Sequence, residues 1–539
     1  MRKFLVIAVF AFVTVAMLAP PVLAQAPAGK VTITGLFDQV TSANRNVQDA
    51  SFADKHDKEW YATTRFRPDF TFELGRTKAV MGFEIDMTYG TVGACSGGPG
   101  KNVSAAAVAA PSCLQKHSGD TADAGLNTDV TGIIELKWAY TEFDLTGKDG
   151  LLPFIPVPSV ARLGLQPFSS LASYKITYAN GDFAGVSAVL NFAPNLKLNL
   201  AYVMVEDEMA VQRATSSSRG NDFAFIVSPD YSVYKGFDIK PLYSLFYAEG
   251  ATTTTARRQA ADVHLGPAYA AATANTAAAA TYGASQNPNG SPSFHEDRHT
   301  IGVDASYRMG PFGLDPTIYY QVGTRDVLAT MNGGTRKVET KMSSWLIDAI
   351  GSYQMGPLLL EARGVYSTGN KPRDNLAKRI SYFEPIDLDT SYYNTWTSIL
   401  GLGVDYKTGC SAGTAGMCTN VGYDRYGRAQ FGLRATYSVT PAFSVFIVTN
   451  PTWTAEKVDT DTDSTRTTIN GSSTLEGDSR YIGTESSIGL TWKFAPNIAL
   501  DWSGSWLAAG KALDSTDPGN VKRKADDALS TSARVRFAF

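Results

Sequence analysis

Residues 428–439 read Arg-Ala-Gln-Phe-Gly-Leu-Arg-Ala-Thr-Tyr-Ser-Val, and this stretch shows the pattern that decides the fold. Successive side chains of a β-strand point to opposite faces, so a strand over these residues has two unlike sides. One side is apolar and the other is polar or charged. The apolar side carries Ala429, Phe431, Leu433, Ala435, Tyr437 and Val439, and the polar side carries Arg428, Gln430, Gly432, Arg434, Thr436 and Ser438.

The same alternation recurs along the chain. In residues 81–89, Met81 and Phe83 share one side, and Glu84 and Asp86 share the other. The alternating segments are mostly about 9–14 residues long, whereas strands of soluble proteins average about 5–6 residues and membrane-spanning strands need about 9–11. The pattern therefore predicts antiparallel strands long enough to cross a bilayer.

A soluble β-sandwich is the alternative interpretation, because its sheets also have one solvated face. Strand length disfavours it, and so do aromatic residues near strand ends, such as Trp60-Tyr61, Tyr319-Tyr320, Trp492 and Trp506. Membrane barrels place aromatic girdles at both interfaces with water.

Short and long connections alternate between the expected strands. Short turns include Gly75-Arg76-Thr77-Lys78 and Gly310-Pro311-Phe312-Gly313. Long polar connections are expected at residues 41–58, 91–130, 208–221, 250–297, 326–340, 370–394, 458–478 and 510–527. Short periplasmic turns and long extracellular loops are typical of bacterial outer-membrane barrels.

The expected fold class is all-β, a closed transmembrane antiparallel β-barrel of about eighteen strands, within a range of about sixteen to twenty. Nineteen candidate strands emerge, and single-chain bacterial barrels normally have an even number. Either residues 396–407 are not a spanning strand, which gives eighteen, or residues 380–389 hide another, which gives twenty. Eighteen is the prediction.

The N-terminus has the pattern of a secretory signal peptide. Arg2 and Lys3 precede an apolar run over residues 4–18, and Val22-Leu23-Ala24 offers small residues for cleavage. We predict a signal peptide at residues 1–24 and a single barrel domain at residues 25–539.

Composition excludes several classes of protein. Lysine and arginine total 48 against 51 aspartates and glutamates, a net charge of −3 that leaves no basic excess for nucleic acid. The apolar content disfavours disorder. After the N-terminus the sequence has no apolar run of about 18 residues, which a membrane helix needs.

The four cysteines form two local pairs in Gly/Ser/Ala-rich stretches. Cys95 is near Cys113 in the sequence, and Cys410 is near Cys418. Export to an oxidising compartment favours a disulfide within each pair. A zinc site would need four converging ligands, and the two pairs lie about 300 residues apart in the sequence.

One catalytic motif needs an explanation. His295-Glu296-Asp297-Arg298-His299 matches H-E-x-x-H, which binds zinc when a helix places both histidines on one face. Here Pro292 precedes it and strand alternation begins at Arg298, so the histidines would lie about 13 Å apart on a strand. We expect a polar loop end and no metal, cofactor or enzymatic activity.

The polar sides of the strands are expected to line a water-filled lumen, because charges on the lipid face are costly. Bases slightly outnumber acids among these residues, which favours a mild preference for anions. For most individual charges, pairing with neighbours that braces the wall is the simpler interpretation. The expected lining comprises Arg65, Arg67, Glu73, Glu84, Asp86, Glu135, Lys137, Arg162, Lys197, Asp304, Arg308, Asp348, Glu361, Arg363, Arg428, Arg434, Asp501, Arg534 and Arg536, and the same alternation adds Lys240 and Glu485.

Two connections invite hypotheses. The Ala-rich stretch 268–282, within the connection 250–297, either folds inward as a constriction or lies outside as a mobile loop. The apolar turn Leu151–Pro158 either packs under the barrel or contacts a periplasmic partner.

The last residues, 531–539, read Thr-Ser-Ala-Arg-Val-Arg-Phe-Ala-Phe. They resemble the C-terminal recognition strand of Gram-negative outer-membrane proteins, which alternates apolar residues and ends in Phe. The resemblance implies insertion in the outer membrane by the barrel-assembly machinery. The whole of residues 25–539 is similar in plan to a porin.

Residues 160–168, Val-Ala-Arg-Leu-Gly-Leu-Gln-Pro-Phe, resemble a strand of alginate-export barrels, with Leu165 where those channels carry a second arginine. The porin resemblance implies passive diffusion of small hydrophilic solutes, and it raises the expectation of a homotrimer. The alternatives are a conduit dedicated to one ligand, such as an acidic polysaccharide or a periplasmic electron carrier, and an adhesin or structural barrel blocked by its loops.

Overall fold

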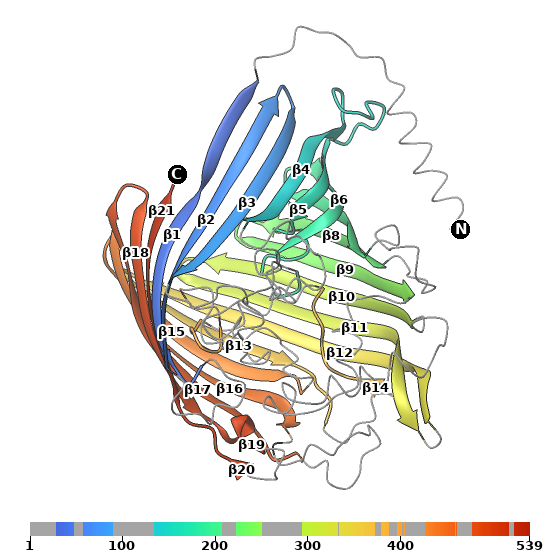
Figure 1. Ribbon diagram of the computed structural model, residues 1–539. Coiled ribbons are helices and arrows are strands. Elements are labelled where there is room, and N and C mark those ends of the chain that lie inside the picture. The colour runs from blue at the N-terminus through green and yellow to red at the C-terminus, as the bar shows by residue number, and fades with distance from the viewer. Residues whose placement is uncertain are drawn as a thin grey trace, which may run out of the picture.

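The computed structural model is an antiparallel β-barrel (Figure 1). It describes residues 29–47, 58–89, 134–169, 171–175, 177–179, 181–206, 222–250, 294–331, 334–371, 379–386, 396–401, 404, 426–458, 460, 477–516 and 522–539.

Several of the sequence predictions lie outside the described residues. They are the signal peptide at residues 1–24, the Ala-rich stretch 268–282, and the four cysteines Cys95, Cys113, Cys410 and Cys418. A disulfide between Cys95 and Cys113, and another between Cys410 and Cys418, therefore both stay predictions.

Eighteen strands build the wall in the described part of the chain, each hydrogen-bonded to the next along the sequence. They are β1 (Lys30–Arg45), β2 (Lys58–Leu74), β3 (Thr77–Tyr89), β4 (Ile134–Thr146), β5 (Ser159–Pro167), β6 (Asp182–Ala193), β7 (Leu196–Glu206), β8 (Asp222–Tyr234), β9 (Phe237–Gly250), β10 (Phe294–Met309), β11 (Phe312–Met331), β12 (Gly334–Met355), β13 (Leu358–Ser367), β15 (Arg428–Thr440), β16 (Phe443–Val458), β17 (Ser479–Ala495), β18 (Ile498–Ala509) and β21 (Ala528–Ala538).

The first and last strands close the ring. β1 pairs with β2 on one side and with β21 on the other, with Asp38 opposite Arg536. Gly35 and Phe539 exchange two backbone hydrogen bonds, of 2.9 and 3.0 Å. A Cβ at Gly35 would lie 2.2 Å from the Arg67 carbonyl oxygen, so only glycine fits at this crossing.

The prediction of eighteen strands is confirmed, and neither uncertain segment spans the wall. In the described part of residues 380–389, only β14 (Arg379–Ile380) forms, and it pairs in parallel with β12. In the described part of residues 396–407, residues 396–401 are bends. Three further short elements, η6 (Lys511–Leu513), β19 (Ser515–Thr516) and β20 (Lys522–Arg523), lie between β18 and β21.

The connections alternate in length as predicted, with one exception. At the short-turn end, Gly75, Gly310 and Gly356 have φ of 60°, 56° and 55°, which suits the left-handed region that tight turns use. The predicted long loop at residues 326–340 is wrong. β11 continues to Met331 opposite Gly334 of β12. Polar composition suggested a loop, but the sequence Asn332-Gly333 is the strongest short hairpin signal.

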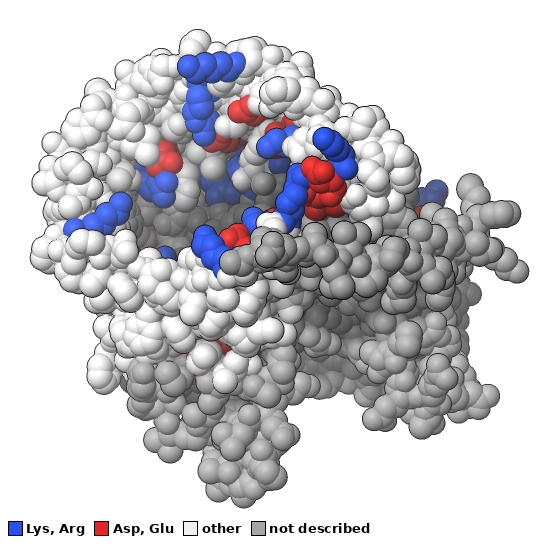
Figure 2. Space-filling model, turned by 90° about the horizontal axis from the view of Figure 1, so that it is seen from above, with Lys and Arg blue, Asp and Glu red and all other residues white. Residues whose placement is uncertain are grey.

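Polarity is inverted relative to a soluble protein. On β10, the outward Ile301 is 51 % exposed, whereas the inward Asp304 is 0 % exposed. Seen from the side where β1 begins, Figure 2 shows blue and red side chains gathered inside a hollow ring whose rim and outer face are largely white. No helix in the described residues has the length and hydropathy to cross a bilayer.

Only some of the aromatic residues predicted to mark the membrane interfaces lie on the outer face of the barrel. Trp60, Trp492 and Trp506 lie on the outer face, exposed by 77 %, 48 % and 48 %. Tyr319 instead points inward and is fully buried, with its ring centroid 5.6 Å from that of Tyr178. It belongs to an apolar cluster inside the barrel, so a sequence-adjacent aromatic pair does not by itself mark an interface.

Candidate functional site

The inner wall carries ion pairs between neighbouring strands. Because inward positions on paired strands lie side by side, an acid on one strand meets a base on the next. Arg65 on β2 bonds Asp86 on β3 at 2.6 and 2.9 Å and reaches Glu84 at 2.9 Å. Arg67 bonds the same Glu84 at 3.0 Å, and Lys137 on β4 lies 4.0 Å from it.

Further pairs continue this pattern around the ring: Arg162 with Glu142 at 2.8 Å, Arg363 with Asp348 at 2.7 Å, Arg434 with Glu361, Arg534 with Asp501 at 2.7 Å, and Arg536 with Asp38 at 2.7 Å.

The bases of several pairs are more exposed than their acids. The side chain of Arg536 is 33 % exposed over a fully buried Asp38. Arg67 is 30 % exposed, against 5 % for Glu84. In these pairs the arginine side chains therefore form more of the exposed inner surface than the acids do, although the formal charges nearly cancel.

Three segments fold into the barrel from the end with the long connections. Inner segment 1 is the described part of the β5–β6 connection, residues 168–169, 171–175 and 177–179. Inner segments 2 and 3 are residues 379–386 and 396–401, both between β13 and β15. All three contact side chains that point inward from the wall.

Inner segment 1 crosses to strands β8 to β12. The backbone N–H groups of Tyr174 and Lys175 donate to one carboxylate oxygen of Asp304, at 2.6 and 2.9 Å. The Tyr174 hydroxyl donates to Asp230, and the Lys240 ammonium lies 4.7 Å from the centre of the Tyr174 ring. One carboxylate on β10 thus fixes the tip of a segment that starts five strands away.

Lys175 anchors that tip. Its ammonium donates to the backbone carbonyls of Asp315 and Asp348, at 2.6 and 2.8 Å. The carboxylates of Asp348 and Asp304 lie 3.7 and 4.0 Å away. Burial lowers the pKa of the Lys175 ammonium, and the two carboxylates oppose that shift. The contacts join β10, β11 and β12 through one side chain.

Inner segment 2 is held by a buried network of four charges. The carboxylate of Glu384 forms ion pairs with Arg325 at 2.6 Å and with Arg298 at 3.1 Å. The same two arginines also form ion pairs with Glu296, Arg325 at 2.8 Å and Arg298 at 3.3 Å. Gln321 on β11 bonds both the carbonyl oxygen and the N–H of Glu384, at 2.6 and 3.0 Å.

Inner segments 1 and 2 also touch each other. The Ile386 N–H donates to the Tyr178 carbonyl at 3.1 Å. Around this contact, Phe168, Phe183, Phe383 and Ile386 form an apolar cluster inside the barrel. The two segments therefore form one layer that narrows the lumen.

Inner segment 3 is bound by a single carboxylate. Glu485 on β17 accepts from the backbone N–H groups of Ser398, Ile399 and Leu400, at 2.9, 2.8 and 2.7 Å. Ile399 and Leu400 pack into a second apolar cluster with Tyr426 and Val458.

The predicted lining residues fall into three groups. Most sit in the wall ion pairs above. Asp304, which is fully buried, instead holds inner segment 1, and the buried Asp348 both pairs with Arg363 in the wall and contacts Lys175 of inner segment 1. Arg428 and Glu135 are also buried. The others lie toward the short-turn end: Glu73 is 3.6 Å from Lys30, Arg308 bonds Asp315 at 2.6 Å, and Lys197 is opposite Asp230 in the strand register.

Several important residues were not singled out from sequence. Lys175 lies in a segment that was not assigned to a strand, Glu384 lies in the uncertain segment 380–389, and Arg325 falls at the edge of a predicted loop. The prediction of a polar loop end at His295-Glu296-Asp297-Arg298-His299 is wrong. These residues are part of β10, paired with β9 and β11, and Glu296 and Arg298 belong to the charge network that holds inner segment 2.

The strand that resembles alginate-export barrels is β5. Its Arg162 pairs with Glu142 on β4. Gln166 is fully buried, donates to the Gly185 carbonyl at 3.2 Å and accepts from the Ser187 hydroxyl at 2.6 Å. Gln166 therefore supports the wall where inner segment 1 begins.

No family model matches the chain, and no curated protein sequence matches it. Similar solved structures include Pseudomonas aeruginosa OccK8 (OprE), with 11 % identity and a TM-score of 0.45 over 95 % of this chain and 98 % of that one. Acinetobacter baumannii OccAB1 has 10 % identity and a TM-score of 0.44, over 94 % and 96 %. A variant of OccD1 (OprD) has 8 % identity and a TM-score of 0.45, over 96 % and 97 %.

Proposed function

We propose that this chain is a porin of the bacterial outer membrane that lets small hydrophilic solutes diffuse through its lumen. The observation that carries the proposal is the inverted polarity of a closed barrel, with apolar side chains outside and paired charges inside. A closed barrel satisfies every ladder hydrogen bond without water, which a lipid environment requires. The wall charges give the lumen a water-compatible lining.

We infer a mild preference for anions. The exposed guanidinium groups of Arg67 and Arg536 stand over more deeply buried acids. A passing ion is nearest to the bases, and rings of basic side chains favour anions in pores.

The inner segments favour small solutes over large ones. Segments 1 and 2 meet inside the barrel and are fixed by buried charges, so they act as a fixed constriction of the lumen. A conduit dedicated to one small anionic ligand is the second candidate, because the same contacts fix the shape of the path. An adhesin would have a lumen blocked throughout.

A swelling assay with proteoliposomes tests the proposal. Liposomes containing the barrel are transferred into isotonic solutions of neutral sugars of increasing size and of small carboxylates. We expect swelling with the smallest solutes, a decline with size, and faster entry of carboxylates than of sugars of equal size. Swelling with one ligand alone would favour the dedicated conduit. Folded protein that admits no solute would contradict the porin.

The proposal extends to assembly. We propose that residues 1–24 are removed on export and that β21 is recognised by the barrel-assembly machinery. We also propose that Cys95 forms a disulfide with Cys113, and Cys410 with Cys418. A homotrimer in the membrane is the expected oligomer. Removal of Phe539 should reduce insertion into the outer membrane, which quantitative blotting of membrane fractions would measure against the intact chain.

A further inference from the structure

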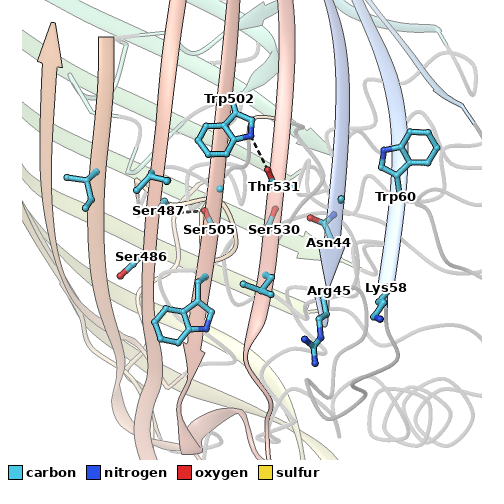
Figure 3. Close-up of a pocket in the computed structure, with 16 residues that line it drawn as sticks. Asn44, Arg45, Lys58, Trp60, Ser486, Ser487, Trp502, Ser505, Ser530 and Thr531 are labelled. Atoms are coloured by element: carbon cyan, nitrogen blue, oxygen red, sulfur yellow. Dashed lines mark hydrogen bonds between the residues drawn. The ribbon is translucent and has the colours of Figure 1, made fainter. Parts of the chain in front are cut away.

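The outer wall carries an apolar groove where the chain closes on itself. It crosses β16, β17, β18, β21, β1 and β2 near the long-connection end and has a volume of about 860 Å³ (Figure 3). One row of directly paired outward residues forms its centre: Ile447, Ile488, Gly504, Thr531, Ala43 and Trp60.

Small residues form the floor and large ones the sides. In the strand register, Gly504, Thr531 and Ala43 stand between the isoleucines and Trp60. Trp502 lies on β18, beside Thr531 (Figure 3). From β18 to β2 the groove is about 14 Å wide, given strands about 4.8 Å apart. The outer face is thus hollowed at this place.

The tryptophans present apolar surface to the groove. Trp60 donates its indole N–H to the Thr41 hydroxyl, Trp502 to the Thr531 hydroxyl and Trp506 to the Asp527 carboxylate, each at 3.1 Å. With their one polar group bonded within the protein, these rings suit contact with acyl chains.

Two bases close the groove at the long-connection end. Arg45 and Lys58 are directly opposite each other on β1 and β2, exposed, on the outer face. Like charges opposite each other across a strand pair are destabilising. Within the described residues neither side chain makes an ion pair or hydrogen bond, unlike the wall arginines that face the lumen.

Two acids lie close by. Asp526 and Asp527 share a neighbouring pocket with Arg45. Asp527 accepts from Trp506 and from the Ala509 N–H, at 3.1 Å each. That carboxylate is therefore bonded to other groups, and Arg45 and Lys58 remain the bases that face the groove.

We propose that this groove binds a membrane lipid with a phosphorylated headgroup, its phosphates on Arg45 and Lys58 and its acyl chains over the floor of small residues. The apolar groove meets Arg45 and Lys58 where the strands leave the hydrocarbon core of the membrane. A lipid headgroup joins its acyl chains at the same depth. The inference requires that the barrel lie in a membrane. It does not depend on whether the barrel conducts ions.

Native mass spectrometry of the detergent-solubilised full barrel tests the proposal. The probes are bis-phosphorylated lipid A, phosphatidylcholine and inorganic phosphate. We expect one retained lipid A per barrel and an affinity about thirtyfold lower in R45Q/K58Q, the effect of two interfacial bases. The control K148Q/K235Q removes two exposed bases at the short-turn end and should bind like the wild type.

The second variant, A43F, fills the floor without changing charge and should also weaken lipid A binding. Unchanged binding by both variants would overturn the proposal. So would displacement of lipid A by inorganic phosphate at equal concentration, which would mean that the groove contributes nothing. An oligomer that R45Q/K58Q dissociates without loss of lipid would assign the groove to a second copy of this chain.

The conductance of R45Q/K58Q should equal that of the wild type, because both bases face outward. Loss of lipid binding with normal conductance therefore supports the lipid site independently of the porin. Normal lipid binding by a barrel that does not conduct would contradict the porin alone.

Discussion

Lys175 shows how single side chains determine the interior of this barrel. Its ammonium contacts groups on β10, β11 and β12, and the carboxylate of Asp304 holds the adjoining backbone. Nothing in the local sequence marks this lysine, because its partners Asp304, Asp315 and Asp348 lie more than a hundred residues away. Long-range contacts of this kind cannot be predicted from alternation alone.

Replacing Lys175 by methionine should release inner segment 1. Removing one partner of a buried ion pair costs about 3–5 kcal/mol, because the remaining charges stay buried without compensation. We expect faster amide hydrogen exchange at residues 171–175 and a larger single-channel conductance. The control is K148M, at an exposed turn. Unchanged protection of residues 171–175 would show that Lys175 does not hold the segment.

Arg67 is the cleanest test of lumen charge. Glu84 has two other basic partners in the structure, Arg65 at 2.9 Å and Lys137 at 4.0 Å. The negative charge of Glu84 therefore stays compensated in Arg67→Gln. The reversal potential in a salt gradient should move toward cation selectivity, and further in Arg67→Glu. Lys235→Gln, at an exposed turn, should leave it unchanged. A shift toward anions in Arg67→Gln would refute the assigned role.

At the scale of elements, alternation in the sequence predicted the strands well because each strand separates two different solvents. Residues 428–439 form most of β15, with Phe431 and Leu433 exposed on the outer face. Segments that stay inside the barrel lack that contrast. Inner segments 2 and 3 therefore looked like a loop or an uncertain strand, and only their contacts with Gln321 and Glu485 show where they belong.

A charge on the outer face should be costly. Leu433→Arg should lower the free energy of unfolding in lipid vesicles by about 2–4 kcal/mol if the site lies near the midplane of the bilayer. The control, Thr436→Arg, places the same residue on the inner side of the same strand and should cost less. Equal losses in urea titrations of the two variants would argue against the assigned lipid face.

Inner segment 3 should depend on Glu485. Glu485→Gln keeps the shape but weakens three hydrogen bonds to a charged acceptor, each of a type worth about 1.5–3 kcal/mol. Amides of residues 398–400 should exchange faster, while those of β17 should not. Glu73→Gln, which changes a carboxylate near the short-turn end, serves as the control. If residues 398–400 were equally protected from hydrogen exchange in Glu485→Gln and Glu73→Gln, apolar packing alone would hold inner segment 3.

At the scale of the whole molecule, closure of the barrel and constriction of its lumen depend on different parts of the sequence. Closure depends on β1 and β21, whose pairing ends at Gly35 and Phe539, and both strands were predictable. The constriction depends on buried charges that join distant segments. The sequence offered stretch 268–282 as a constriction, and that hypothesis lies outside the described residues. Inner segments 1 and 2 narrow the lumen of the described barrel.

Single-channel recording of the wild-type barrel in a planar bilayer, under a gradient of potassium chloride, tests the central claim most directly. A water-filled, charge-lined lumen predicts stable, discrete current steps. Because the exposed guanidinium groups attract anions, we predict a reversal potential whose sign indicates selectivity for chloride over potassium. Folded protein that inserts without current would contradict the open lumen, and a reversal potential of the opposite sign would contradict the inferred charge of its surface.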